Sequence, residues 1–178
     1  MLDLPPEKGV NPDPVTPQPS LVQVGPAKLA QGIHCGDFSL AFGFDWARQI
    51  VDQFELVPMP RAPAWVLGAV NVNGLVVPVV DLSNYFSETT VPAQLERGQR
   101  LLVGGIQDED AESALAVVFS QTPAQLDYQT RPWANVAALP ARLQEVCNGA
   151  ASDDQGNTYI EVNPDKLMDA LAAELSVI

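Results

Sequence analysis

Two apolar runs of nearly equal length flank the dipeptide Asn73-Gly74 near the middle of the chain. They cover residues 66–72 and 75–80 and consist mostly of valine, which favours strands. Asn-Gly suits a two-residue type I′ turn, because both central residues of that turn need positive φ. The pattern therefore predicts a β-hairpin. Its expected register pairs Val72 with Leu75, Val70 with Val77, and Gly68 with Val79.

Both faces of this hairpin are largely apolar, and only Asn71 and Pro78 interrupt the second face. A hairpin with one face in water would not show this pattern, so we expect burial on both sides, between packed sheets or small barrels. Pro78 would lie opposite Ala69 in a non-hydrogen-bonded pair, and its missing N–H indicates an edge, a bulge or a corner on the outer side. Gly68 would permit a close approach or a bend.

Strands are also expected at residues 38–42, 101–106, 114–119 and 159–162, and residues 45–51 fit either a helical turn or a strand. The acid-rich segment 107–112 would form a turn that joins the strand at 101–106 to the strand at 114–119.

Two helices are predicted in the C-terminal third. Residues 140–147 form the first, with Pro140 at its first position and Gly149 just past its end. Asn163-Pro164-Asp165 starts the second with a cap, a first-turn proline and an acid near the positive end of the dipole. The apolar stripe of this second helix should pack on the strands: Leu167, Met168, Leu171 and Leu175.

Residues 1–28 contain seven prolines and few large apolar side chains. Such a segment cannot bury enough surface to offset its ordering entropy, so we expect a disordered tail there and a folded domain over residues 29–178. The tail could dock another protein, or it could be an extension without a partner.

Net charge and length narrow the classes of function. The chain has 178 residues and a formal net charge of −13, which disfavours nucleic acid and anionic membrane surfaces as partners. No apolar stretch approaches the ~20 residues of a membrane helix, and the N-terminus does not resemble a secretory signal. With two cysteines, the chain fits a reducing cytoplasm, without direct membrane insertion.

The residues that could support catalysis are few. His34 and Cys35 are adjacent, and adjacent strand residues point to opposite faces, which makes them a poor nucleophilic pair. One histidine and two distant cysteines do not make a zinc site, and the acids of residues 107–112 lack a calcium-loop pattern. We expect a protein that is not an enzyme and that needs no cofactor or metal.

The hairpin segment resembles the signature of the CheW-like domain, the adaptor of bacterial chemosensory arrays. In that family Pro-x-Ala-Pro leads to Gly-Val, Asn-Leu-Arg-Gly, an apolar run, Pro-Val and Asp-Leu. Ten positions match in order: Pro60, Ala62, Pro63, Gly68, Asn71, Gly74, Pro78, Val79, Asp81 and Leu82. Trp65 and the segment 69–72 are most similar to the pilus-associated, twitching-motility branch.

The resemblance implies a mainly β fold: two small SH3-like five-stranded β-barrels on a shared core, with a C-terminal α-helix. It also implies an adaptor that couples the cytoplasmic tip of a chemoreceptor to the regulatory domain of a CheA-type histidine kinase, without chemistry of its own. Such an adaptor would be cytoplasmic and recruited to membrane-associated receptor arrays. The candidate protein-binding residues lie on the motif: Asn71, Val72, Asn73 and Gly74.

Asn73 departs from the family pattern, which usually has arginine at this position. The turn requirement alone would explain Asn73-Gly74, and loss of the arginine puts the usual receptor–kinase coupling in question. A second interpretation is a small β-barrel domain that binds a ligand or localises an array, having kept the fold and lost the coupling.

Overall fold

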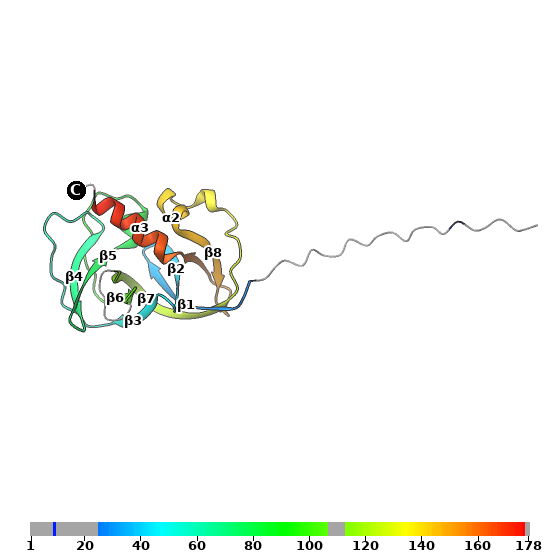
Figure 1. Ribbon diagram of the computed structural model, residues 1–178, viewed down its shortest axis with the longest axis horizontal. Helices are drawn as coiled ribbons and strands as arrows, with labels where there is room; N and C mark the ends of the chain where they lie inside the picture. The colour runs from blue at the N-terminus through cyan, green and yellow to red at the C-terminus, as the bar shows by residue number, and fades with distance from the viewer. Residues whose placement is uncertain (1–8, 10–24, 107–112, 177–178) are drawn as a thin grey trace, which may run out of the picture.

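Nine β-strands and three α-helices make up the part of the chain that the computed structural model describes, which comprises residue 9, residues 25–106 and residues 113–176 (Figure 1). The strands are β1 (Lys28–Cys35), β2 (Phe38–Gly43), β3 (Ala47–Val51), β4 (Val66–Val72), β5 (Leu75–Val80), β6 (Arg100–Gly104), β7 (Leu115–Tyr128), β8 (Cys147–Ser152) and β9 (Thr158–Val162). The helices are α1 (Leu82–Phe86), α2 (Ala141–Val146) and α3 (Pro164–Leu175).

Two five-stranded β-barrels share the long strand β7. In the first barrel β6 and β5 flank β7, β3 pairs with β6, and β4 pairs with β5. In the second barrel β7 pairs with β1, and the order continues through β2 and β9 to β8. The mainly β fold with two small barrels and a C-terminal helix is thus confirmed, and α3 crosses above the region between the two groups of strands (Figure 1).

A bulge allows β7 to serve both barrels. Its pairing with β1 shifts between Gly32, which faces Ala124, and His34, which faces Ser120, so that β7 has two more residues than β1 there. Gln121 lies in this stretch with φ of +64°. Extra residues on one strand bend it and increase its twist. The prediction of a strand over residues 114–119 was therefore too short, because the strand continues beyond the bend to Tyr128.

Buried side chains form three clusters. One fills the first barrel and is rich in valine, a second fills the second barrel, and the third lies between the barrels and beneath the helices. Successive residues of β7 alternate between two of them: Ala116 and Val118 belong to the first barrel, while Leu115, Val117 and Phe119 belong to the shared core. This double burial explains why the first part of β7 has no polar positions.

The predicted hairpin is confirmed in its bounds and in its register. Val72 faces Leu75, Val70 faces Val77, and Gly68 faces Val79. Burial on both sides was only partly correct. The inner face fills the first barrel, and Val80 enters the shared core, but Val76 at the tip of the outer face is 69% exposed.

Pro78 and Gly68 have the positions that their chemistry predicts. Ala69 exchanges two backbone hydrogen bonds of 2.8 Å with Val57, so its N–H and C=O point away from Pro78. The outer side of β5 pairs with β7 only from Val79 onward, directly after the proline. At Gly68 the carbonyl oxygen of Val57 would lie 2.4 Å from an added Cβ, so the backbones approach as closely as the glycine allows.

β1 is a strand that the sequence analysis did not predict, and it begins at Lys28, one residue before the expected start of the folded domain and ten residues before the first predicted strand. Lys28, which was assigned to the tail, is the first residue of β1, and its Nζ lies 2.9 Å from Oε1 of the buried Glu161. Thr130 donates a 2.6 Å hydrogen bond to the other carboxylate oxygen. The rest of the expected tail, apart from Gly9 and residues 25–27, lies outside the described residues, as does the expected acidic turn at 107–112.

The C-terminal predictions are mostly confirmed. α3 begins as expected, with the Asn163 side chain accepting a 3.0 Å hydrogen bond from the N–H of Lys166. Nearer the N-terminus, the segment that fitted either a helical turn or a strand is strand β3 over residues 47–51. The helix predicted at 140–147 is α2, which follows Pro140 and ends at Val146, one residue early, and Gly149 does not terminate it, because β8 starts at Cys147 and contains Gly149 with φ of +152°. There it contacts the backbone of Arg131, which bridges to Ala150.

Candidate functional site

The tip of the β4–β5 hairpin presents a small polar surface. Asn73 has φ of +52° and Gly74 has φ of +89°, as a type I′ turn requires. The side-chain oxygen of Asn71 accepts a 2.9 Å hydrogen bond from the N–H of Gly74 and so closes the turn. All three residues are exposed. The tip is therefore a tight turn closed by its own hydrogen bond, with the Asn73 side chain exposed to solvent.

Val72 lies in a different environment from the other candidate residues. Its side chain is 5% exposed and packs among the valines inside the first barrel. A partner at the tip could reach Val72 only through its backbone. Conversely, Val76 was not predicted as a contact residue, although its apolar side chain projects into solvent beside the turn. Strand alternation places Val76 on the face opposite Leu75, but both faces of the hairpin are apolar in sequence, so no local signal marks Val76 as exposed.

The base of the hairpin is attached to the shared core through Asp81 and Leu82. The N–H of Asp81 donates a 2.8 Å hydrogen bond to the carbonyl of Trp65. Its carboxylate accepts a 3.1 Å hydrogen bond from the N–H of Asn84 and caps the start of α1. Leu82 is fully buried. These contacts give the Asp-Leu of the motif a structural role at the base of the hairpin.

The adjacent His34 and Cys35 do not form a catalytic pair. His34 Nδ1 lies 3.0 Å from the hydroxyl of Ser39, whereas the thiol of Cys35 points into the shared core and donates to the carbonyl of Val118 at 3.5 Å. Burial raises the pKa of the Cys35 thiol far above its usual value, and the nearby Asp81 raises it further. A neutral, buried thiol is a poor nucleophile.

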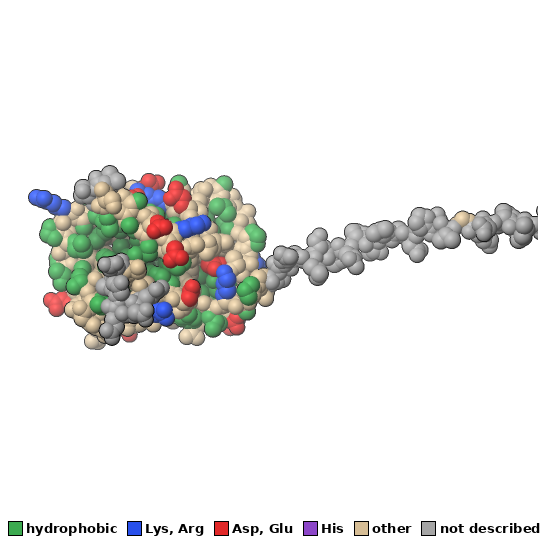
Figure 2. Space-filling model, viewed as in Figure 1, with side chains coloured by type: hydrophobic (Ala, Val, Ile, Leu, Met, Phe, Trp, Pro, Cys, Tyr) green, Lys and Arg blue, Asp and Glu red, His purple; other side chains and the backbone are tan. Residues whose placement is uncertain are grey.

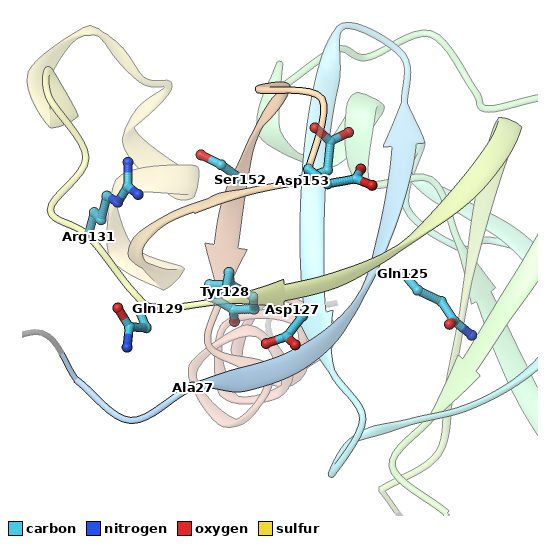
Figure 3. A pocket seen from close by; sticks show the side chains of 9 residues that line it. Ala27, Gln125, Asp127, Tyr128, Gln129, Arg131, Ser152 and Asp153 are labelled. Carbon is cyan, nitrogen blue, oxygen red and sulfur yellow. The ribbon is translucent and has the colours of Figure 1, made fainter.

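A polar hollow of about 610 Å³ lies on the second barrel beside the end of β7 (Figure 3). Its side chains point in different directions: Arg131 and Gln129 on one side, and Gln125 far from both. The Asp153 carboxylate accepts hydrogen bonds from Gln155 and from the backbone and side chain of Asn157, and the side-chain amide contributes most to lowering the pKa of this carboxyl. The acid therefore stabilises its own turn.

Within the described ranges, no three histidine, cysteine or acidic side chains are grouped so that they could hold a metal ion. Over the same ranges, no helix combines the length and apolar character needed to cross a membrane.

The two thiols should react at very different rates. Cys35 is 3% exposed, while Cys147 is partly exposed at the start of β8. We expect Ellman's reagent to modify Cys147 in the native protein and Cys35 only as fast as the protein unfolds, because the thiolate of Cys35 is not accessible. Stopped-flow absorbance would measure both phases. Cys147→Ser should remove the faster phase, and a fast phase that persists in this variant would contradict the burial of Cys35.

Comparisons with known proteins point to one family. The sequence profile of the CheW-like domain matches residues 31–172, which include most of both barrels and α3. A protein of Rhizobium meliloti (strain 1021), described as "Chemotaxis protein CheW", is 42% identical over 48 residues. This match covers 27% of the present chain and only 31% of the relative. The solved structure of the scaffolding protein TtCheW from Thermoanaerobacter tengcongensis has a TM-score of 0.57 at 14% identity, covering 76% of this chain and 88% of that one.

Proposed function

Because this chain belongs to the CheW-like domain family, we propose that it is a non-catalytic adaptor of a bacterial chemosensory system. It binds the regulatory domain of a CheA-type histidine kinase and the cytoplasmic tip of a chemoreceptor, and it works in the cytoplasm at membrane-associated receptor arrays. The observation that carries this function is the profile match over residues 31–172, which spans both barrels rather than the hairpin alone.

The hairpin tip is the surface that we assign to the partners. Asn71, Asn73 and Gly74 are exposed on a turn held by its own hydrogen bond, and Val76 adds an apolar side chain beside them. A preformed loop loses little entropy on binding, and recognition residues are frequent on loops that a rigid scaffold supports. Trp65 and residues 69–72 favour a pilus-based, twitching-motility output for the system.

Asn73 should shift the balance between the two partners. It has no charge, whereas the family usually presents arginine at this position, and the chain has a net charge of −13. We therefore expect the kinase regulatory domain to bind more tightly than a receptor fragment, since the cation that the family offers is missing. Titration calorimetry of the full chain against each partner would measure the two dissociation constants.

Asn73→Arg is the informative variant in this titration. It should strengthen receptor binding by roughly threefold to tenfold, equivalent to ~0.7–1.4 kcal/mol, and leave kinase binding nearly unchanged. The matched control is Gln155→Arg, which adds the same charge at an exposed turn of the second barrel. If the unmodified protein binds the receptor fragment at least as tightly as the kinase domain, Asn73 acts only as a turn residue. If neither partner binds, the adaptor function itself is wrong.

A further inference from the structure

An apolar groove of about 500 Å³ lies between the hairpin and the outer side of α3. The segment from Met59 to Pro63 forms one wall, and α3 forms the other. Trp65, Val80 and Leu115 at the bottom belong to the shared core and are almost fully buried. Figure 2 shows hydrophobic side chains on the surface over the part of the molecule where Figure 1 places β4, β5 and the C-terminal end of α3.

α3 uses its apolar residues for two different contacts. Leu167 and Leu171 are buried in the shared core. Met168, Ala172 and Leu175 line the groove together with one side of Leu171, and Leu175 is 47% exposed. Their spacing, i, i+3, i+4 and i+7, is the pattern by which one helix packs against another. The expectation that the stripe packs on the barrels is therefore confirmed for Leu167, Met168 and Leu171, which lie in or against the shared core, whereas Leu175 near the end of the helix is 47% exposed.

The charge of the groove is opposite to that of the chain. Although the protein has 22 acidic and 9 basic residues, the groove lining contains no carboxylate, and its one charged side chain is Arg61. Arg61 is exposed at the wall formed by the 59–63 segment, and none of the ion pairs among the described residues includes it. A carboxylate on the occupant would meet a guanidinium there without a competing acid in the lining.

We propose that this groove binds an amphipathic helix of a partner protein. The apolar side of that helix would pack against the apolar side chains of α3 in the groove, and a carboxylate on it would face Arg61. The groove offers the side of α3 as one wall and the 59–63 segment as the other, which is the geometry of helix-in-groove recognition. Met59 and Met168 stand on opposite walls, and their flexible side chains can adapt to the incoming residues. The groove is lined by residues other than those of the hairpin tip, so its occupancy can be tested separately from the binding that Asn73 should influence.

Methionine labelling provides a direct test, because the chain has three methionines and two of them line the groove. The full-length protein with 13C-methyl methionine would be titrated with a Leu-rich amphipathic peptide of about 15 residues, long enough to form a helix. One version carries glutamate beside the apolar stripe, and a second carries lysine at the same place. We expect the methyl signals of Met59 and Met168 to shift, that of Met1 to stay, and the glutamate peptide to bind roughly threefold more tightly.

Two variants on neighbouring positions control this titration. Ala172→Asp puts a carboxylate into the groove and should weaken the glutamate peptide at least about tenfold. Ala173→Asp adds the same charge to an exposed residue of α3 outside the lining and should leave binding unchanged. Arg61→Glu should reverse the preference between the two peptides. Equal binding to both α3 variants would overturn the proposal, as would shifts of Met59 and Met168 on dilution alone, which would assign the groove to a second copy of the chain.

Discussion

The variant Val77→Asp should lose cooperative folding, whereas Val76→Asp, one position away on β5, should keep it. Val77 is completely buried among the valines of the first barrel, and Val76 is 69% exposed. A carboxylate at position 77 has no partner in this apolar interior, and burying it would cost roughly 4–5 kcal/mol. This is a large part of the ~5–15 kcal/mol by which domains are stable. At position 76 the cost should stay below about 1 kcal/mol.

Urea unfolding followed by tryptophan fluorescence would compare the two variants with the parent. Val70→Asp, at the position opposite Val77, should behave like Val77→Asp. Because the two substitutions at positions 76 and 77 introduce the same charge into the same strand, any difference between them measures burial rather than strand propensity. A Val77→Asp protein with the unfolding midpoint of the parent would show that the inner face of the hairpin is not barrel interior.

Gly68→Ala should destabilise the protein by roughly 3 kcal/mol. The backbone at Gly68 has φ of +149°, which L side chains rarely adopt, and the new Cβ would lie 2.4 Å from the carbonyl oxygen of Val57. That oxygen cannot move away freely, because it accepts a 2.8 Å hydrogen bond from Ala69. The substitution therefore combines backbone strain with a contact that only a shift of the 57–59 segment can relieve.

Gly74→Ala separates these two effects. Gly74 also has a positive φ, of +89°, but no atom lies within 4 Å of its added Cβ. Only the strain remains, and the loss should be about 1–2 kcal/mol. The free energy of unfolding from urea titrations of both variants gives the comparison. Equal losses at the two positions would mean that the contact with Val57 adds nothing.

The hairpin could be predicted closely because its determinants are local. The Asn-Gly turn, the alternation of valines and the cap at Asn163 each involve residues within a few positions of one another. By contrast, β1 was missed because its sequence contains Gln31, Gly32 and His34, residues that do not favour strands by themselves. They are in a strand because β2 and β7 pair on either side of it.

Gly32 shows why tertiary contacts select such residues. The ring of Tyr159 from β9 lies against it, and an added Cβ would be 2.8 Å from that ring. Gln31 is buried, and its side-chain amide donates a 2.8 Å hydrogen bond to the carbonyl of Ala124 in β7. Tyr159 and Ala124 are both far from these residues in the sequence. No local pattern could therefore have indicated that position 31 needs an amide and position 32 a small residue.

The amino-acid sequence by itself determined the hairpin, its register, the start of the last helix and the family signature, because short-range dihedral preferences and hydrogen bonds control all of these. Only the tertiary structure decided which faces are buried. It placed Val72 in the barrel and Val76 in solvent, and it divided the stripe of α3 between the core and the groove. Burial depends on segments such as 59–63 and 168–175, which are distant in sequence and meet only when the chain has folded.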